Sequence, residues 1–253
     1  MWFAQEKDLE KQPQESQIDE LIHENEEIVN MYYNDLWDAF NEEIAAQLPE
    51  YRPFDCEIEL EPGAVLTHGP TYHMTPDEEA ELKKFLDEME EKGFIRRSKS
   101  EASYPVLYVP KKKGDKRLCT NYRHLNKVTK RNSFPLPRID QVFEAMRDAK
   151  IYSKLDLKSS YNLIRIKEGD EYKTAFSTKF GLYEYLVMPF GLTNTPATFQ
   201  SFINHVLREE INDCCQVYLD DIIIYSKILE EHIAHVRRVL TRLIENKLVA
   251  VKI

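Results

Sequence analysis

The chain has 253 residues, of which 42% are hydrophobic, 31% charged and 11% aromatic. This composition excludes wholesale disorder and fits one large or two modest domains. No apolar run approaches the roughly 20 residues that a membrane helix needs, and the first residues lack the basic and apolar regions of a signal peptide. We therefore expect an intracellular protein with no membrane partner. The four cysteines form no C-x-x-C pair and indicate neither a disulfide framework nor a structural zinc site.

Charge is spread unevenly along the chain, whose net charge is −10. Residues 1–62 hold 18 acids and three bases, a balance of −15, which leaves +5 for residues 63–253. Within the second region, residues 111–131 contain nine Lys or Arg and a single acid, Asp115. A basic cluster of this kind can neutralise phosphates, although a solvated lysine-rich turn is the simpler alternative.

The acidic segment 1–54 is predicted to be helical. Between residues 18 and 44, apolar side chains recur at near-helical spacing, which predicts one or two amphipathic helices. We favour a solvated helix here. Aromatic residues such as Trp2 and Trp37 leave a partner-binding helix as the alternative.

Strong turn and capping signals define the elements that follow. Thr75-Pro76-Asp77-Glu78 is a capping box that starts a helix ending at Gly93. Residues 106–109 predict a strand, and a basic turn leads into a second strand through residues 118–119, which together make a hairpin.

The second half of the chain mixes strands and helices without the regular rhythm of a parallel sheet. In residues 151–157, alternation places Lys154 and Asp156 on the face opposite Leu155 and Leu157. Because strands and helices are mixed without that regular rhythm, an α+β fold is expected. The other predicted elements are a helix from about Arg138, strands at 163–166, 174–177 and 183–187, a helix at 195–209, a hairpin within 216–226 and a helix at 229–246.

Three carboxylates carry the chemistry that we expect. Asp220 and Asp221 separate two apolar strand-forming runs, which places both acids at a hairpin turn. A solvated Asp-Asp turn would explain the pair alone, but Asp156 is a further acid at the end of an apolar strand. Three acids from two strands can hold two Mg²⁺ ions, which prefer oxygen ligands and activate a hydroxyl for in-line displacement at phosphorus. Nucleotidyl transfer is the reaction that fits.

Several motifs in order resemble one family. They are EKGFI (91–95), LCTNYRHLN (118–126), SFPLPR (133–138), LDLKSSY (155–161), MPFGLTNTPATFQ (188–200) and VYLDDIIIYS (217–226). From about residue 55 to residue 253 the chain is similar to the reverse transcriptase of Gypsy-type long-terminal-repeat retrotransposons, in its fingers and palm.

The resemblance implies roles at matching positions. Asp156, Asp220 and Asp221 would be catalytic, and these acids together with the Leu157 backbone carbonyl would bind the metal ions. Tyr161 would exclude ribose, although from pattern alone a core aromatic is the simpler reading. The implied nucleotide-binding residues are Lys112, Lys113, Arg117, Ser160, Tyr161, Phe190 and Gly191.

The family also implies an architecture and partners. Residues 55–150 would form the fingers with the start of the palm, and residues 151–253 mainly the palm, an antiparallel sheet packed on helices, with thumb and ribonuclease H absent. The cofactor would be two Mg²⁺ ions, with Mn²⁺ as a substitute. Partners would be an RNA or DNA template-primer, dNTPs and the remaining polyprotein domains: thumb, ribonuclease H and integrase. The cytoplasm, a virus-like particle or the nucleus would be the compartment.

Several alternatives stay open at this stage, among them another two-metal palm enzyme such as a DNA-dependent polymerase. The chain could be a catalytically inactive derivative that serves as a nucleic-acid-binding or assembly module. His232 and His235 have a spacing that could suggest a metal site, but no acid or cysteine pattern completes it, and we expect a solvated helix face. Arg123 and Asn126 are expected to tie the fingers together, with template contact as the alternative.

Overall fold

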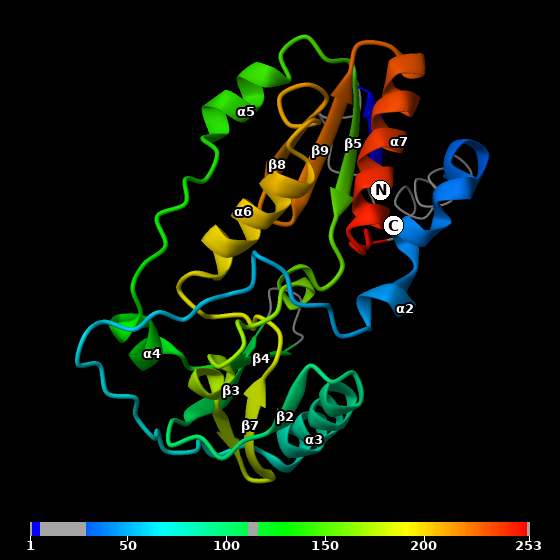
Figure 1. Cartoon of the computed structure of the whole chain (residues 1–253). Helices are drawn as coiled ribbons and strands as arrows, with labels where there is room; N and C mark the ends of the chain where they lie inside the picture. Colours follow the sequence, from blue (N-terminus) through cyan, green and yellow to red (C-terminus); the bar gives the residue numbers. More distant parts are fainter. Residues whose placement is uncertain (1, 6–28, 111–115, 252–253) are drawn as a thin grey trace. The chain divides into compact units, whose positions relative to one another are not determined.

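The computed structural model describes residues 2–5, 29–110 and 116–251 (Figure 1). The chain forms two compact units. Unit 1 comprises Met1–Ala45, Phe134–Ser160 and Gln200–Ile253, and unit 2 comprises Ala46–Ser133 and Tyr161–Phe199. Among the described residues, no helix has the length and apolar character needed to cross a membrane.

Unit 1 is built on a four-stranded antiparallel sheet in the order β1-β5-β9-β8. The long helix α7 (Leu229–Glu245) packs against β5 and β9 and buries Val236, Val239, Leu240 and Leu243. These apolar side chains recur at helical spacing, as the sequence predicted. The strands are β1 (Trp2–Gln5), β5 (Ile151–Asp156), β8 (Cys215–Tyr218) and β9 (Asp221–Ser226). The other helices are η2 (Asn34–Phe40), α2 (Glu42–Ala45), α5 (Ile139–Ala145) and the part of α6 (Thr195–Val206) from Gln200 onward.

Unit 2 holds a five-stranded sheet in the order β2-β7-β6-β3-β4, in which only β3 and β6 run parallel. Helix α3 (Pro76–Glu91) covers this sheet through Leu82, Leu86 and Met89, which join a core with Phe176 and Tyr183. The strands are β2 (Ile95–Arg97), β3 (Tyr104–Pro110), β4 (Lys116–Thr120), β6 (Phe176–Thr178) and β7 (Gly181–Tyr185). The shorter helices are α4 (Arg123–Val128), η4 (Glu171–Thr174) and η3 (Ser160–Leu163), which begins in unit 1.

Most predicted elements are confirmed, and the α+β class with them. The capping box of α3 is complete, since the Thr75 hydroxyl accepts from the Glu78 N–H and the Glu78 carboxylate accepts from the Thr75 N–H. The strand predicted at 163–166 is wrong. That segment ends a 3-10 helix and then makes only isolated bridges, through Arg165 and Ile166.

The N-terminal helix prediction falls partly on residues 6–28, which lie outside the described residues. In the described part, residues 29–33 are helical, and η2 follows with a kink at Leu36. The described residues of this segment therefore form short helical pieces, with α2 following η2. Strand β1, which no pattern predicted, pairs with β5 at the sheet edge, Trp2 opposite Lys154.

The expectation of a solvated face at His232 is wrong as well. His232 is fully buried, with Nε2 2.7 Å from Ser153 Oγ and Nδ1 2.9 Å from Ser226 Oγ. Ser226 Oγ is also 2.8 Å from His235 Nδ1. The two serines lie on β5 and β9, so this network ties both strands to α7. Burial lowers the pKa of His232 to about 4, with a smaller contribution from neighbouring His235.

Candidate active site

The three predicted carboxylates meet at one end of the sheet of unit 1. Asp156 is the last residue of β5 and Asp221 the first of β9, and the two are directly opposite in the antiparallel register. Directly opposite residues have Cα atoms about 4.5 to 5.5 Å apart and point to the same face. Asp220 precedes Asp221 in the turn, and its carbonyl accepts from the Leu157 N–H at 3.3 Å. The structure thus brings together Asp156, Leu157, Asp220 and Asp221.

The turn that carries the acids is held by a residue that the sequence analysis missed. Tyr218 pairs with Asp221, so the hairpin loop has two residues, and the first of them, Leu219, has a φ of +56°. A positive φ suits tight hairpin turns but is costly for leucine. Gln200 of α6 is fully buried and offsets the cost of this backbone conformation. Its side chain accepts from the Leu219 N–H at 2.8 Å and donates to the Val217 carbonyl at 3.2 Å.

A signal for Gln200 was present in the sequence. It lies in a helix whose neighbouring positions Phe199, Phe202 and Ile203 are apolar, and all of them are buried. A buried amide must find hydrogen-bond partners. A glutamine on the apolar face of a helix therefore indicates a specific backbone target, although its identity requires the tertiary structure.

A lysine lies among the carboxylates. Lys154 Nζ is 2.7 Å from Asp221 Oδ1, and the side chains are 46% and 44% exposed. This contact raises the pKa of Lys154. Burial raises the pKa of Asp156, and repulsion by Asp220 and Asp221 raises it further. The acids are therefore close enough to interact electrostatically, and one ammonium group does not neutralise all three.

The carboxylate oxygens of Asp156, Asp220 and Asp221 are the type of ligand that a hard divalent cation such as Mg²⁺ prefers. Burial and repulsion from Asp220 and Asp221 raise the pKa of Asp156, and a divalent ion bound here would relieve that repulsion. In the part of the chain that the structure describes, no three His, Cys, Asp or Glu side chains form a group that could hold a metal ion. Asp221 is instead engaged by Lys154.

Unit 2 gathers a second set of predicted residues around Tyr161. Its ring makes edge-on contacts with Phe190, at a centroid distance of 4.8 Å, and with Phe199, at 5.5 Å. Phe190 is 46% exposed, and the Arg117 guanidinium lies 5.4 Å from its ring centroid. An exposed aromatic next to an arginine provides a flat apolar surface with a cation beside it.

The loop after Phe190 is fixed by Asn126. The Asn126 side chain donates to the Gly191 carbonyl at 2.7 Å and accepts from the Thr193 N–H at 2.8 Å. The interpretation that Asn126 ties the unit together is confirmed. Gly191 has a φ of +99°, a backbone conformation that residues with a side chain rarely adopt, so glycine suits this position.

The remaining predicted site residues are placed as follows. Ser160 is buried in the first turn of η3. Lys112 and Lys113 lie outside the described residues.

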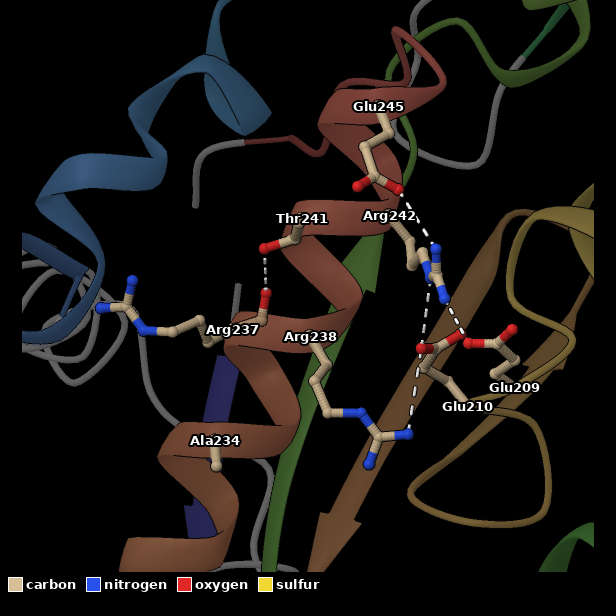
Figure 2. A pocket seen from close by; sticks show the side chains of 8 residues that line it. All are labelled: Glu209, Glu210, Ala234, Arg237, Arg238, Thr241, Arg242 and Glu245. Carbon is tan, nitrogen blue, oxygen red and sulfur yellow. Dashed lines mark hydrogen bonds and ion pairs between the residues drawn. The ribbon is translucent and has the colours of Figure 1, made fainter.

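A hollow beside α7 is lined mostly by charged side chains (Figure 2). Arg237 points away from Arg238 and Arg242, which reach toward Glu210. Arg242 Nε is 3.4 Å from Glu210 Oε1, and Arg242 also pairs with Glu209 and Glu245. These ion pairs connect α7 to the segment after α6, and we infer that they stabilise the packing of the two.

Comparisons with known proteins find similar sequences and similar folds. Residues 109–251 match the family model described as "Reverse transcriptase (RNA-dependent DNA polymerase)". The transposon Tf2-3 and Tf2-7 polyproteins of Schizosaccharomyces pombe are 39% and 38% identical over 212 residues, 83% of this chain. The chain spans 16% of the length of these relatives.

Solved structures share the fold at lower identity. The native prototype foamy virus protease-reverse transcriptase superposes with a TM-score of 0.74 at 20% identity, over 91% of this chain and 30% of that one. The foamy viral protease-reverse transcriptase in complex with an RNA/DNA hybrid gives a TM-score of 0.77 at 19% identity, over 96% of this chain and 33% of that one.

Proposed function

Because the chain belongs to the reverse transcriptase (RNA-dependent DNA polymerase) family, we propose that Asp156, Asp220 and Asp221 catalyse transfer of deoxynucleotides to a primer 3′ hydroxyl on an RNA or DNA template. The observation that supports this most directly is the register of β5 and β9, which sets Asp156 opposite Asp221 with Asp220 beside them. The Gypsy-type relationship expected from the motifs is confirmed by the transposon relatives.

The proposed cofactor is a pair of Mg²⁺ ions, for which Mn²⁺ can substitute. When bound, such ions activate the primer hydroxyl and stabilise charge on the leaving pyrophosphate. Asp156 and Asp220 would be the principal ligands, with Asp221 and the Leu157 carbonyl completing the set. The Gln200 contacts would keep Asp220 and Asp221 in position, because they fix the turn from which both acids project.

Residues of unit 2 are proposed to bind the incoming nucleotide. Arg117 supplies a guanidinium suited to charge-assisted contacts with a triphosphate, and Lys112 and Lys113 would add charge. Tyr161 would exclude a ribose 2′ hydroxyl by bulk, held in place by Phe190 and Phe199. Gly191 would allow close approach of the nucleotide. Ser160, which belongs to unit 1, would border the sugar.

Template-primer and other polyprotein domains are the proposed partners. The foamy viral relatives are described in complex with an RNA/DNA hybrid and with double-stranded DNA. Residues 111–131, with nine Lys or Arg, provide the charge that would neutralise backbone phosphates here. Affinity for template-primer should therefore fall steeply as salt rises.

Primer extension by the 253-residue chain with Mg²⁺ and dNTPs on an RNA template tests the proposal. Asp220→Asn should lower the rate at least about a thousandfold, because it removes a carboxylate that stabilises the bound ions. Asp213→Asn is the matched control, since Asp213 is an exposed acid of the same unit paired with Arg238. Equal rates in wild type and Asp220→Asn would contradict the proposal. Tight template-primer binding without extension by any variant would favour the binding-module alternative.

A further inference from the structure

The Lys154–Asp221 ion pair lies inside the proposed metal site. Lys154 and Asp156 are two residues apart on β5 and therefore share a face, and Asp221 is the cross-strand partner of Asp156. The lysine consequently reaches diagonally across the sheet to place Nζ 2.7 Å from Asp221 Oδ1. The charge of Lys154 is thus held against one of the three oxygen donors expected to bind metal.

We propose that Lys154 is a built-in counter-cation that competes with divalent ions for Asp221 and so sets the metal affinity of the site. This inference rests on the proposed function. An ammonium group and a divalent ion need the same carboxylate oxygen, so full metal binding requires the ion pair to open.

A purely structural role explains the placement less well. Both partners are nearly half exposed, and ion pairs of this kind add little to stability. The same exposure leaves room for the four-carbon side chain of Lys154 to move into solvent when a metal ion takes Asp221. Lys158 shows the contrast in the same unit, because its ammonium pairs with Glu42, 3.0 Å away, and engages none of the three acids.

Direct measurement of Mn²⁺ binding tests the inference. Free Mn²⁺ is followed by electron paramagnetic resonance as it is titrated into the 253-residue chain without nucleic acid. Lys154→Met should tighten binding roughly fivefold to tenfold, because it frees Asp221 and removes a like charge a few ångströms from the ion. Lys154→Arg keeps the charge and should bind as wild type does.

Lys227→Met is the matched control. Lys227 directly follows β9 and lies at the strand end opposite Asp221, about 20 Å away for an extended chain of this length, so salt screens its charge. Removal of this lysine should leave the Mn²⁺ affinity unchanged. Equal tightening by Lys227→Met and Lys154→Met would overturn the inference, because it would reflect net charge alone.

The remaining outcomes separate the two proposals. If Asp156→Asn abolishes Mn²⁺ binding while Lys154→Met binds as wild type or more weakly, the role of Lys154 is wrong and the metal site stands. If Mn²⁺ binding does not depend on Asp156, the proposed function fails as well. The shift of the thermal unfolding midpoint on adding Mn²⁺ is a second readout, expected to be larger for Lys154→Met and for Lys154→Gln than for wild type.

Discussion

Strands β5 and β9 differ sharply between their two ends. At one end lie Asp156 and Asp221, half exposed, close to each other and only partly neutralised by Lys154. Toward the other end, Ser153 and Ser226 are buried and hydrogen-bonded to a fully buried His232.

The difference separates stability from function. The serine-histidine network is satisfied internally and holds α7 to the sheet, so it needs no ligand. The carboxylate end retains unbalanced negative charge, which costs stability unless a cation is added. Repulsion that is kept at one end of an otherwise satisfied sheet supports the proposed metal site.

The largest effect on this comparison is expected from Gln200→Met. The substitution preserves side-chain length but leaves the Leu219 N–H and the Val217 carbonyl without their partner, at a cost of about 3 kcal/mol. It should also lower primer extension, because the turn that carries two of the acids loses its support. Urea unfolding and primer extension, measured on the same preparations, check both effects.

Gln216→Met is the control for this prediction. Gln216 is a buried glutamine of β8 that donates to the Asn212 side chain. Its loss should lower stability with little change in extension by the folded protein. Similar loss of activity in both variants at matched stability would argue against a special role for Gln200.

His232 is expected to make stability depend on pH. Its pKa is about 4 in the folded protein, against about 6.5 when unfolded, so the unfolded chain binds the proton more strongly. The contribution of neutral His232 to the free energy of unfolding is therefore fully present above pH 6.5 and is lost as the pH drops toward 4. Between pH 7.5 and pH 5.0 the free energy of unfolding should fall by about 2 kcal/mol because of this residue.

Urea unfolding of wild type and His232→Gln at the two pH values measures this effect. The variant should lose about 2 kcal/mol less than wild type on acidification. His205→Gln, which changes an exposed histidine of α6, should keep the wild-type profile. An unchanged pH dependence in His232→Gln would show that the buried network does not titrate as described.

Tyr161→Ala tests the sugar-selecting role proposed for unit 2. Selectivity for dNTP over rNTP should fall about tenfold, since the ring that would clash with a 2′ hydroxyl is removed. Tyr172→Ala, which removes an exposed tyrosine of the same unit, is the control. Single-nucleotide incorporation with each substrate gives the ratio of dNTP to rNTP use. Unchanged selectivity in Tyr161→Ala would show that Tyr161 does not select the sugar.

The smallest expected effect is a gain of stability at the end of α7. Lys247 has a φ of +54°, and the Leu248 N–H donates to the Leu243 carbonyl in the hydrogen-bonding pattern that usually places glycine here. Lys247→Gly should stabilise the protein by about 1 kcal/mol without changing Mn²⁺ affinity. Lys227→Gly, at a position without positive φ, should give no gain. A destabilised Lys247→Gly would contradict this account.

Local patterns were sufficient to predict much of the fold and part of the site. The capping box located α3, and two apolar runs around Asp220 and Asp221 located the β8–β9 hairpin. Alternation in residues 151–157 correctly put Asp156 on the more exposed face. These signals depend only on neighbouring residues, so one sequence contains them in full.

The contacts that complete the site depend on residues far apart in the chain. Lys154 meets Asp221 only because β5 and β9 pair in one register, and no local pattern fixes that register. His232 was expected in solvent because its burial requires serines from two strands. Such partners are set by tertiary packing, which explains why these contacts escaped prediction.

The central claim is that Asp156, Asp220 and Asp221 share bound divalent ions. Iron(II) should occupy the proposed site in place of Mg²⁺ and, with ascorbate and peroxide, generate hydroxyl radicals that cleave the nearby backbone. Mass spectrometry of the fragments should show cuts beside residue 156 and beside residues 220–221, both lost in Asp156→Asn. Cleavage at one of these segments without the other, or cuts that persist in Asp156→Asn, would contradict the account.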